Sequence, residues 1–233
     1  DLGELATLVG QGIPVTGQLA GGLEIKGWID NLRGEGTLTV TGLGAYGVTA
    51  DQVTTEFHWQ DQTMVLDSLV AQVGGGRVSA DGVIDQTQGW NLLVQAQGVD
   101  LESLNLTLRQ RQGLQGLLQG QGKVTGDWTQ PRIKAEVTVI DGAVGGYRLD
   151  ELNGQVAFAQ GIIHLPSVSL RLGADVYRLS GEVDLSQNPR DPALDLQLDL
   201  AQASLEGLTL LFPEAKSWLW QDPLLVMLRC GGE

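Results

Sequence analysis

Alternation of apolar and polar residues over six short runs is the feature that most restricts the fold of this chain. The runs lie between Gly120 and Leu200, and each ends at Gly, Pro, Asp or Asn. A period of two places apolar side chains on one face of a β-strand and polar side chains on the other. Short links between the runs make neighbouring strands antiparallel. We therefore expect an all-β fold, with a short helical or irregular segment at 101–112 and strands at about 117–126, 132–141, 152–159, 162–172, 175–185 and 193–200.

The same pattern occurs twice along the chain. Asp1-Leu2-Gly3-Glu4-Leu5 is matched by Asp100-Leu101-Glu102-Ser103-Leu104, and Gly82 is matched by Gly181 at the same spacing (181 − 82 = 99). Five additional residues at 188–192 have the composition of a loop, and a third start appears at 204–208. Repeats of this kind stack because one unit cannot cover its own apolar face. The sequence predicts a segment of a longer protein with repeat units at 1–99 and 100–203, then a short helix and a truncated third unit at 204–233.

One irregularity recurs in both units. In the fourth run of each unit the apolar phase slips by one residue, at Asp67-Ser68 and at Pro166-Ser167. An uncompensated slip would turn the rest of the apolar set toward water. We therefore predict a β-bulge at both places. Pro166 also indicates an edge strand or an interrupted ladder, because proline has no N–H to donate.

The charge balance excludes several classes of partner. The chain has 14 Lys and Arg against 28 Asp and Glu, a formal net charge of −14. This charge repels nucleic-acid phosphates and disfavours docking of the whole surface on anionic headgroups. The single cysteine, Cys230, allows neither a disulfide framework nor a thiolate metal site. No apolar run reaches the roughly 18 residues that a membrane-spanning helix requires.

The candidate chemical motifs are weak. Residues 42–47 match the spacing of a dinucleotide fingerprint, but the β-branched residues that follow predict a strand rather than the helix such a site needs. His58 and His164 lack ligand spacing, and we expect exposed strand histidines. Asp150 and Glu151 are adjacent in a strand and point to opposite faces. No loop has the alternating carboxylates of a calcium site. We expect no catalytic residue, no metal and no cofactor, and therefore no enzyme.

The apolar phase itself is the remaining candidate site. Two interpretations stay open: a dry core between two sheets, or an open groove in which an acyl chain gains roughly 0.8 kcal/mol per buried CH₂. The aromatic content of only 5% and the lack of a long amphipathic helix to cover the face favour the groove. The apolar set comprises Leu38, Val40, Val53, Phe57, Trp59, Met64, Leu66, Leu69, Val73, Val78, Ile84, Leu92 and Val94 in the first unit, and Ile133, Val137, Val139, Leu152, Val156, Phe158, Ile163, Leu165, Val168, Leu170, Leu172, Leu179, Val183, Leu196 and Leu198 in the second.

The second unit resembles a known family in the order of its motifs. These are Gly-x-Gly-x-x-x-Gly-Asp-Trp-x-x-Pro at 120–131, Asp-Gly at 141–142, Leu-Asp-x-Leu-x-Gly at 149–154, Ile-x-Leu-Pro at 163–166 and Leu-Ser-Gly-Glu-Val-Asp-Leu at 179–185. This order is similar to that of the AsmA-like superfamily, which includes AsmA, YhdP and TamB types, and it looks most like the TamB type of the translocation and assembly module. The resemblance extends over both units, residues 1–203.

The resemblance implies an elongated, mostly antiparallel curved sheet, a β-taco with an open, solenoid-like apolar groove. It implies a periplasmic location in the envelope of a diderm bacterium, with the parent protein anchored in the inner membrane. The expected function is transport of phospholipid or another acyl-chain lipid between inner and outer membranes. The alternative is a scaffold for outer-membrane β-barrel assembly that pairs strands with an Omp85-type, TamA-like partner. A third possibility, an adhesin or carbohydrate-binding solenoid, needs exposed aromatics in register, and the six tryptophans do not repeat in register.

Overall fold

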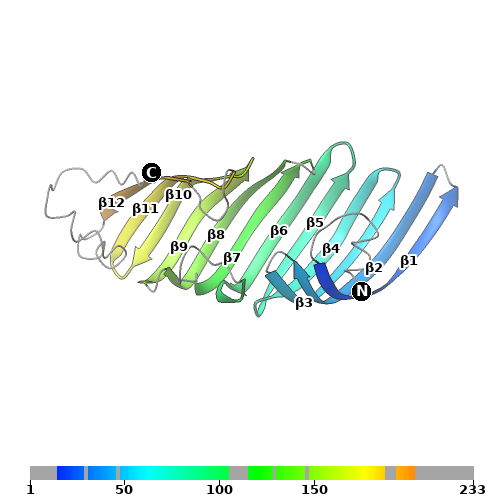
Figure 1. The fold of residues 1–233 in the computed structure, drawn as a ribbon, viewed down its shortest axis with the longest axis horizontal. Coiled ribbons are helices and arrows are strands. Elements are labelled where there is room, and N and C mark those ends of the chain that lie inside the picture. Colours follow the sequence, from blue (N-terminus) through cyan, green and yellow to red (C-terminus); the bar gives the residue numbers. More distant parts are fainter. Residues whose placement is uncertain are drawn as a thin grey trace. The chain divides into compact units, whose positions relative to one another are not determined.

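The structure, a computed structural model, describes residues 15–28, 31–45, 48–104, 115–127, 130–144, 147–186 and 193–202. In these residues the chain is all-β, as the alternation predicts. The strand order of the sheet is the order of the chain, from β1 to β12, with no crossover (Figure 1). The chain divides into two compact units, residues 1–106 with 118–132, and residues 107–117 with 133–233. The repeat boundaries at 99/100 and 203/204 stay a prediction.

The first unit is an antiparallel meander. Each strand from β1 to β5 pairs with the next strand in the chain. Only residues 101–104 of the expected helical segment at 101–112 are described, and Glu102–Leu104 form a single 3₁₀ turn (η1). The strands are β1 (Val15–Trp28), β2 (Asn31–Ala45), β3 (Val48–Gln60), β4 (Thr63–Val73), β5 (Gly76–Asp85) and β6 (Gly89–Asp100), followed by β7 (Gln115–Gly126).

The second unit has the same kind of meander. Its strands are β8 (Pro131–Val144), β9 (Tyr147–Ala159), β10 (Ile162–Leu172), β11 (Asp175–Asp184) and β12 (Ala193–Gln202). The bounds of β9, β10 and β11 lie 99 residues after those of β3, β4 and β5 (147 − 48 = 99, 162 − 63 = 99, 175 − 76 = 99). The six strands predicted for the second repeat are β7 to β12, and all are present, some a few residues longer than expected. The predicted third unit and its helix lie outside the described residues.

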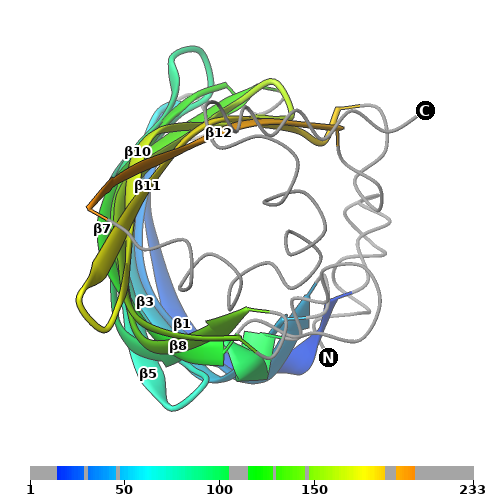
Figure 2. The same cartoon turned by 90° about the vertical axis from the view of Figure 1, so that its left-hand side faces the viewer.

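Both predicted β-bulges are confirmed. The β4–β5 register shifts between Leu66 and Leu69, and the β10–β11 register shifts between Leu165 and Val168. Pro166 lies at the second shift and has a registered partner on neither neighbouring strand. Because β10 pairs with both β9 and β11, the proline marks an interrupted ladder and not an edge. Bulges bend the strands that contain them, and Figure 2 shows strands of both units bent along their length.

Local turn chemistry explains the short links. Gln160 and Gly161, which join β9 to β10, have φ angles of 55° and 81°. Positive φ at both central residues is the conformation of a type I′ hairpin turn, whose twist matches that of the flanking strands. At the nucleotide-like motif, β3 begins at Val48, so the expected strand, and no helix, follows the glycines. Tyr46 and Gly47 themselves lie outside the described residues.

Burial is shallow in both units. The core of the first unit is a small cluster of Ala50, Val53, Ala71, Val73 and Val99, on which half-buried side chains such as Leu104 and Leu118 pack. Among the described residues, no polar or charged residue is buried. Most apolar side chains of the sheet are therefore only partly removed from water.

Candidate functional site

Strand register decides which side chains share a face in the first unit. Directly opposed residues of neighbouring strands lie on the same face of a sheet. From β1 to β6 the register therefore defines four rows, and we call the side on which they lie the apolar face. The rows are Ile25, Gly34, Trp59, Met64, Ile84 and Trp90; Leu23, Gly36, Phe57, Leu66, Gly82 and Leu92; Gly21, Leu38, Thr55, Leu69, Ala80 and Val94; and Leu19, Val40, Val53, Ala71, Val78 and Ala96.

The second unit has its own apolar face from β9 to β12. Val156 belongs to it by alternation with Phe158 on β9, and Leu172 by alternation with Leu170 on β10. Ile133, Val137 and Val139 alternate along β8 and so share one face of that strand. The rows are Phe158, Ile163, Val183 and Leu194; Leu165, Gly181 and Leu196; Gly154, Val168, Leu179 and Leu198; and Leu152, Leu170 and Tyr177.

Most of the predicted apolar side chains are half-buried. Six are buried, Ile133 is exposed, and the others lie between these limits. All described strands belong to one sheet order, so no second sheet faces this surface among the residues the structure describes. The buried members are Val53, Leu66, Val73, Leu92, Val139 and Val168.

Two aromatic rings cover the apolar face where β2 has glycines. Trp59 lies opposite Gly34 and Phe57 lies opposite Gly36. The two rings stack, with centroids 6.1 Å apart and planes 23° apart. Because glycine has no Cβ, the rings lie directly on the backbone of β2 and supply the apolar surface that its own residues lack.

The sequence interpretation missed Tyr177, the most buried large side chain of the second unit. Tyr177 has no exposed surface, lies opposite Leu170, and its hydroxyl is 3.4 Å from Asp175 Oδ2. Burial, with the charge of Asp175 as a smaller contribution, raises the pKa of Tyr177 to about 12. A neutral tyrosine therefore fills this position at all physiological pH values. The 99-residue spacing from Val78 is the signal that would have found it (177 − 78 = 99).

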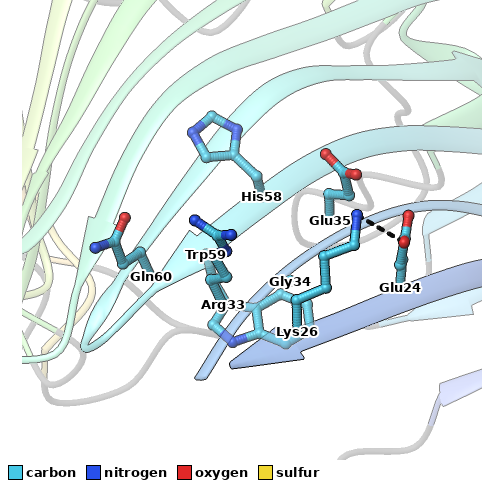
Figure 3. A pocket seen from close by; sticks show the side chains of 8 residues that line it. All are labelled: Glu24, Lys26, Arg33, Gly34, Glu35, His58, Trp59 and Gln60. Atoms are coloured by element: carbon cyan, nitrogen blue, oxygen red, sulfur yellow. Dashed lines mark ion pairs between the residues drawn. The ribbon is translucent and has the colours of Figure 1, made fainter. Parts of the chain in front are cut away.

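The first unit has a hollow of about 300 Å³ across β1, β2 and β3, lined mainly by polar-face residues together with Gly34 and Trp59 of the apolar face (Figure 3). Lys26 Nζ donates a hydrogen bond to Glu24 Oε1 at 2.7 Å, and this contact lowers the pKa of the Glu24 carboxyl. Both side chains are more than half exposed, so the ion pair contributes little stability. The sequence interpretation did not predict this hollow, because its lining comes from three strands. The lining residues are Glu24, Lys26, Arg33, Gly34, Glu35, His58, Trp59 and Gln60.

Both histidines lie on strands, and their side chains are 51% (His58) and 41% (His164) exposed. His58 Nδ1 lies 2.8 Å from Asp67 Oδ2, and His164 Nδ1 lies 3.0 Å from Glu182 Oε1. Each partner is on the next strand, since β3 pairs with β4 and β10 with β11. These are cross-strand polar pairs on the water side of the sheet, and neither histidine is part of a metal-ligand set in the described residues.

Asp150 and Glu151 do not form a carboxylate pair. Asp150 Oδ2 accepts a hydrogen bond from the backbone N–H of Gly173 at 2.6 Å. Glu151 instead accepts hydrogen bonds from Asn153 and Arg171, and these contacts lower the pKa of the Glu151 carboxyl. The two carboxylates therefore have separate structural partners and are not aimed at a common atom.

Among the described residues, no group of three or more His, Cys, Asp or Glu side chains is arranged to hold a metal ion. No helix in the described residues is long and apolar enough to span a membrane.

Comparison with protein-family models, with curated proteins and with solved structures found no match to this chain.

Proposed function

We propose that this chain is a non-enzymatic lipid-binding segment, in which the apolar face of each unit receives the acyl chains of a phospholipid. The observation that carries the proposal is the register, which places apolar side chains of six strands in four rows on one face, with glycines and Thr55 at the remaining positions. The polar side chains lie on the opposite face. One surface of the sheet thus suits hydrocarbon and the other suits water.

The dimensions of the rows suit an acyl chain. Neighbouring strands are about 4.8 Å apart, so a row across six strands is about 24 Å long. Half the hydrocarbon core of a bilayer is about 15 Å thick, which is the depth that one leaflet's acyl chains occupy. A chain laid along a row would remove apolar surface from water at roughly 0.8 kcal/mol per CH₂. No polar headgroup site is needed to hold it.

The resemblance to AsmA-like proteins supplies the biological setting of the proposal. In that setting the segment is part of a periplasmic bridge, and lipid moves along successive apolar faces between the inner and outer membranes. Partial burial of most apolar side chains supports a sliding guest, because the half-buried side chains keep some surface that a hydrocarbon chain can contact. The proposal requires no cofactor and no catalytic group.

Two adjacent residues of β6 give a matched test. Val94 belongs to the apolar face, whereas Leu93 points to the polar face opposite Asp81 and is 53% exposed. A photocrosslinking amino acid is placed at one position or the other in the full chain. Each protein is then irradiated with vesicles of phosphatidylethanolamine that carries a radiolabelled acyl chain. We expect strong lipid crosslinking from position 94 and only background crosslinking from position 93.

A charge substitution completes the test. Val94→Asp should abolish co-purification of lipid, while Leu93→Asp should leave it unchanged, because only the first charge lies where the acyl chain packs. Circular dichroism and urea unfolding check that both variants are folded. Equal crosslinking from both positions would disprove the lipid-binding face.

The scaffold alternative makes the opposite prediction. A sheet that acts by pairing its edge with the strand of an Omp85-type client uses backbone hydrogen bonds, not the apolar face. In that case Val94→Asp would preserve activity in an outer-membrane assembly assay. Substitutions on an edge strand would then abolish it.

A further inference from the structure

Strand β1 is an end strand with an exposed row of apolar side chains. Among the described strands it pairs only with β2. Leu23 and Ile25 are 54% and 56% exposed, and Leu19 is exposed as well. Strand β12 of the second unit likewise has only β11 as a partner among the described strands, and Leu194 on it is exposed. The outer edge of an end strand presents backbone groups that can pair with another strand.

The first unit itself shows how such edges pair. Strand β7 follows β1 by 99 residues in the repeat (124 − 25 = 99), and β12 follows β6 by 104 (196 − 92 = 104). Because β6 and β7 are neighbours in the sheet, a strand of the β12 type meets a strand of the β1 type within one chain. At this junction Leu118, the counterpart of Leu19, is half-buried and packs on the core.

Close contacts of glycine define the register of the β6–β7 junction. A Cβ on Gly89 would lie 2.0 Å from the carbonyl oxygen of Gly126 and 2.9 Å from the Cα of Asp127. Gly82 shows the same pattern of distances: its Cβ would lie 2.3 Å from the oxygen of Asn91 and 2.9 Å from the Cα of Leu92. In that case Gly82 pairs directly with Leu92, the residue that contributes the Cα. Gly89 is therefore opposite Asp127, which in an antiparallel ladder places Leu92 opposite Val124.

When the register of the β6–β7 junction is applied to β12 and β1, the end strands of the described sheet, residues of matching chemistry face each other. Leu196, the counterpart of Leu92, falls opposite Ile25, and Leu198 falls opposite Leu23. One residue away, on the polar face, Asp195 falls opposite Lys26. Apolar residues thus face apolar residues, and a carboxylate faces an ammonium group. Opposed pairs of both kinds stabilise antiparallel strands.

We propose that the outer edge of β1 is an interaction surface for β12 of a second copy of this chain. The copies join head to tail by antiparallel strand addition, which continues both the sheet and its apolar face. Two different edges meet, so the contact is heterologous and does not end at a dimer. The inference goes beyond the proposed lipid binding and does not depend on it.

Sedimentation velocity of the full chain without lipid tests the proposal. We expect the weight-average sedimentation coefficient to rise with protein concentration beyond the value for a dimer. Ile25→Lys should abolish this rise, because a lysine on an edge strand blocks the approach of another strand. Ile25 is more than half exposed, so the variant should fold normally. Thr37→Lys adds the same charge to the exposed polar side of β2 and should leave the association unchanged.

A charge exchange tests the register. Lys26→Glu and Asp195→Lys should each weaken the association, and the chain with both substitutions should recover it. A chain that stays monomeric at every concentration overturns the proposal, and so does association that survives Ile25→Lys. Failure of the double variant to recover overturns the pairing of β12 with β1. Since no lipid is present, these outcomes leave the lipid-binding proposal to its own test.

Discussion

At the scale of single residues, the apolar face depends on where glycines allow large rings to lie. A Cβ on Gly34 would be 2.0 Å from Cη2 and 2.3 Å from Cζ2 of Trp59, well inside van der Waals contact. The glycine is therefore required by the ring on the neighbouring strand. Gly22, on β1, has no atom within 4 Å of the same position.

These two glycines make a matched pair of substitutions. Gly34→Ala should displace the indole of Trp59 and lower the free energy of unfolding by about 1–3 kcal/mol, as overpacking does in other proteins. Gly22→Ala should leave stability unchanged or raise it slightly, because alanine restricts the unfolded chain. Urea unfolding measures both. Equal stability of the two variants would contradict the placement of the ring over Gly34.

Hydrogen bonds at a turn stabilise the ionised form of the Asp85 carboxylate. Its Oδ2 accepts from Thr63 Oγ1 at 2.7 Å, and its Oδ1 accepts from the hydroxyl and N–H of Thr87 at 2.6 and 2.8 Å. The side-chain hydrogen bonds of Thr87 and then Thr63 lower the pKa of Asp85 strongly. Asp184, 99 residues later, accepts from Ser186 N at 2.8 Å, and its pKa is also lowered.

The lowered pKa of Asp85 predicts the sign of a pH effect. An aspartate whose folded pKa lies below the unfolded value of about 3.9 stabilises the fold above that value. Its contribution disappears as the pH falls through the folded pKa. The stability difference between the wild type and Asp85→Asn should be constant from about pH 7 to 5 and shrink below about pH 4. Urea unfolding across this range measures it, and a difference that grows on acidification would contradict the hydrogen-bond assignment.

At the scale of elements, the bulge in β4 keeps one face apolar along a strand whose apolar phase changes. The registers of β4 with β3 and with β5 shift at the same place, between Leu66 and the residues after it. One residue of β4 is therefore surplus to both ladders. Its side chain, that of Asp67, is exposed and contacts His58.

Deletions distinguish the surplus residue from its neighbours. Deletion of Asp67 should leave a folded protein, because both ladders then run without a shift and Leu69, Ala71 and Val73 stay on the apolar face. Deletion of Val70 should cost about 3 kcal/mol or more, since it turns the buried Ala71 and Val73 toward water. Circular dichroism and urea unfolding compare the two. Equal destabilisation would show that the bulge does not control the register.

At the scale of the whole molecule, the proposed lipid binding predicts that the apolar faces favour contact with a membrane while the net charge opposes it. The charge of −14 repels an anionic surface, and this repulsion extends over a Debye length of about 30 Å at 0.01 M salt but about 8 Å at 0.15 M. Contact between hydrocarbon and the apolar face has no such dependence.

This contrast predicts how vesicle binding responds to salt. Co-flotation with phosphatidylglycerol vesicles should increase between 0.01 and 0.15 M salt, as screening removes the repulsion, whereas binding to phosphatidylcholine vesicles should not change. Stronger binding to phosphatidylglycerol at low salt would indicate a basic docking patch instead of an apolar face.

Much of the fold could be predicted because the decisive pattern is local. Alternation assigns each side chain to one of two faces before any partner strand is known, so the approximate positions of the strands, both bulges and the apolar set followed from residues a few positions apart. The polar hollow and the ring stack of Phe57 and Trp59 over β2 could not be predicted in the same way. They depend on which residues of separate strands become neighbours.

The sequence by itself determined that the chain makes antiparallel strands with one apolar and one polar face, because a period of two and the turn residues leave few other structures open. Only the tertiary structure decided which residues face each other, how deeply Tyr177 and Leu92 are buried while Leu23 and Ile25 stay exposed, and which strands lie at the edges. The physical reason is that burial depends on neighbours supplied by other strands, and an edge is the place where no described neighbour is supplied.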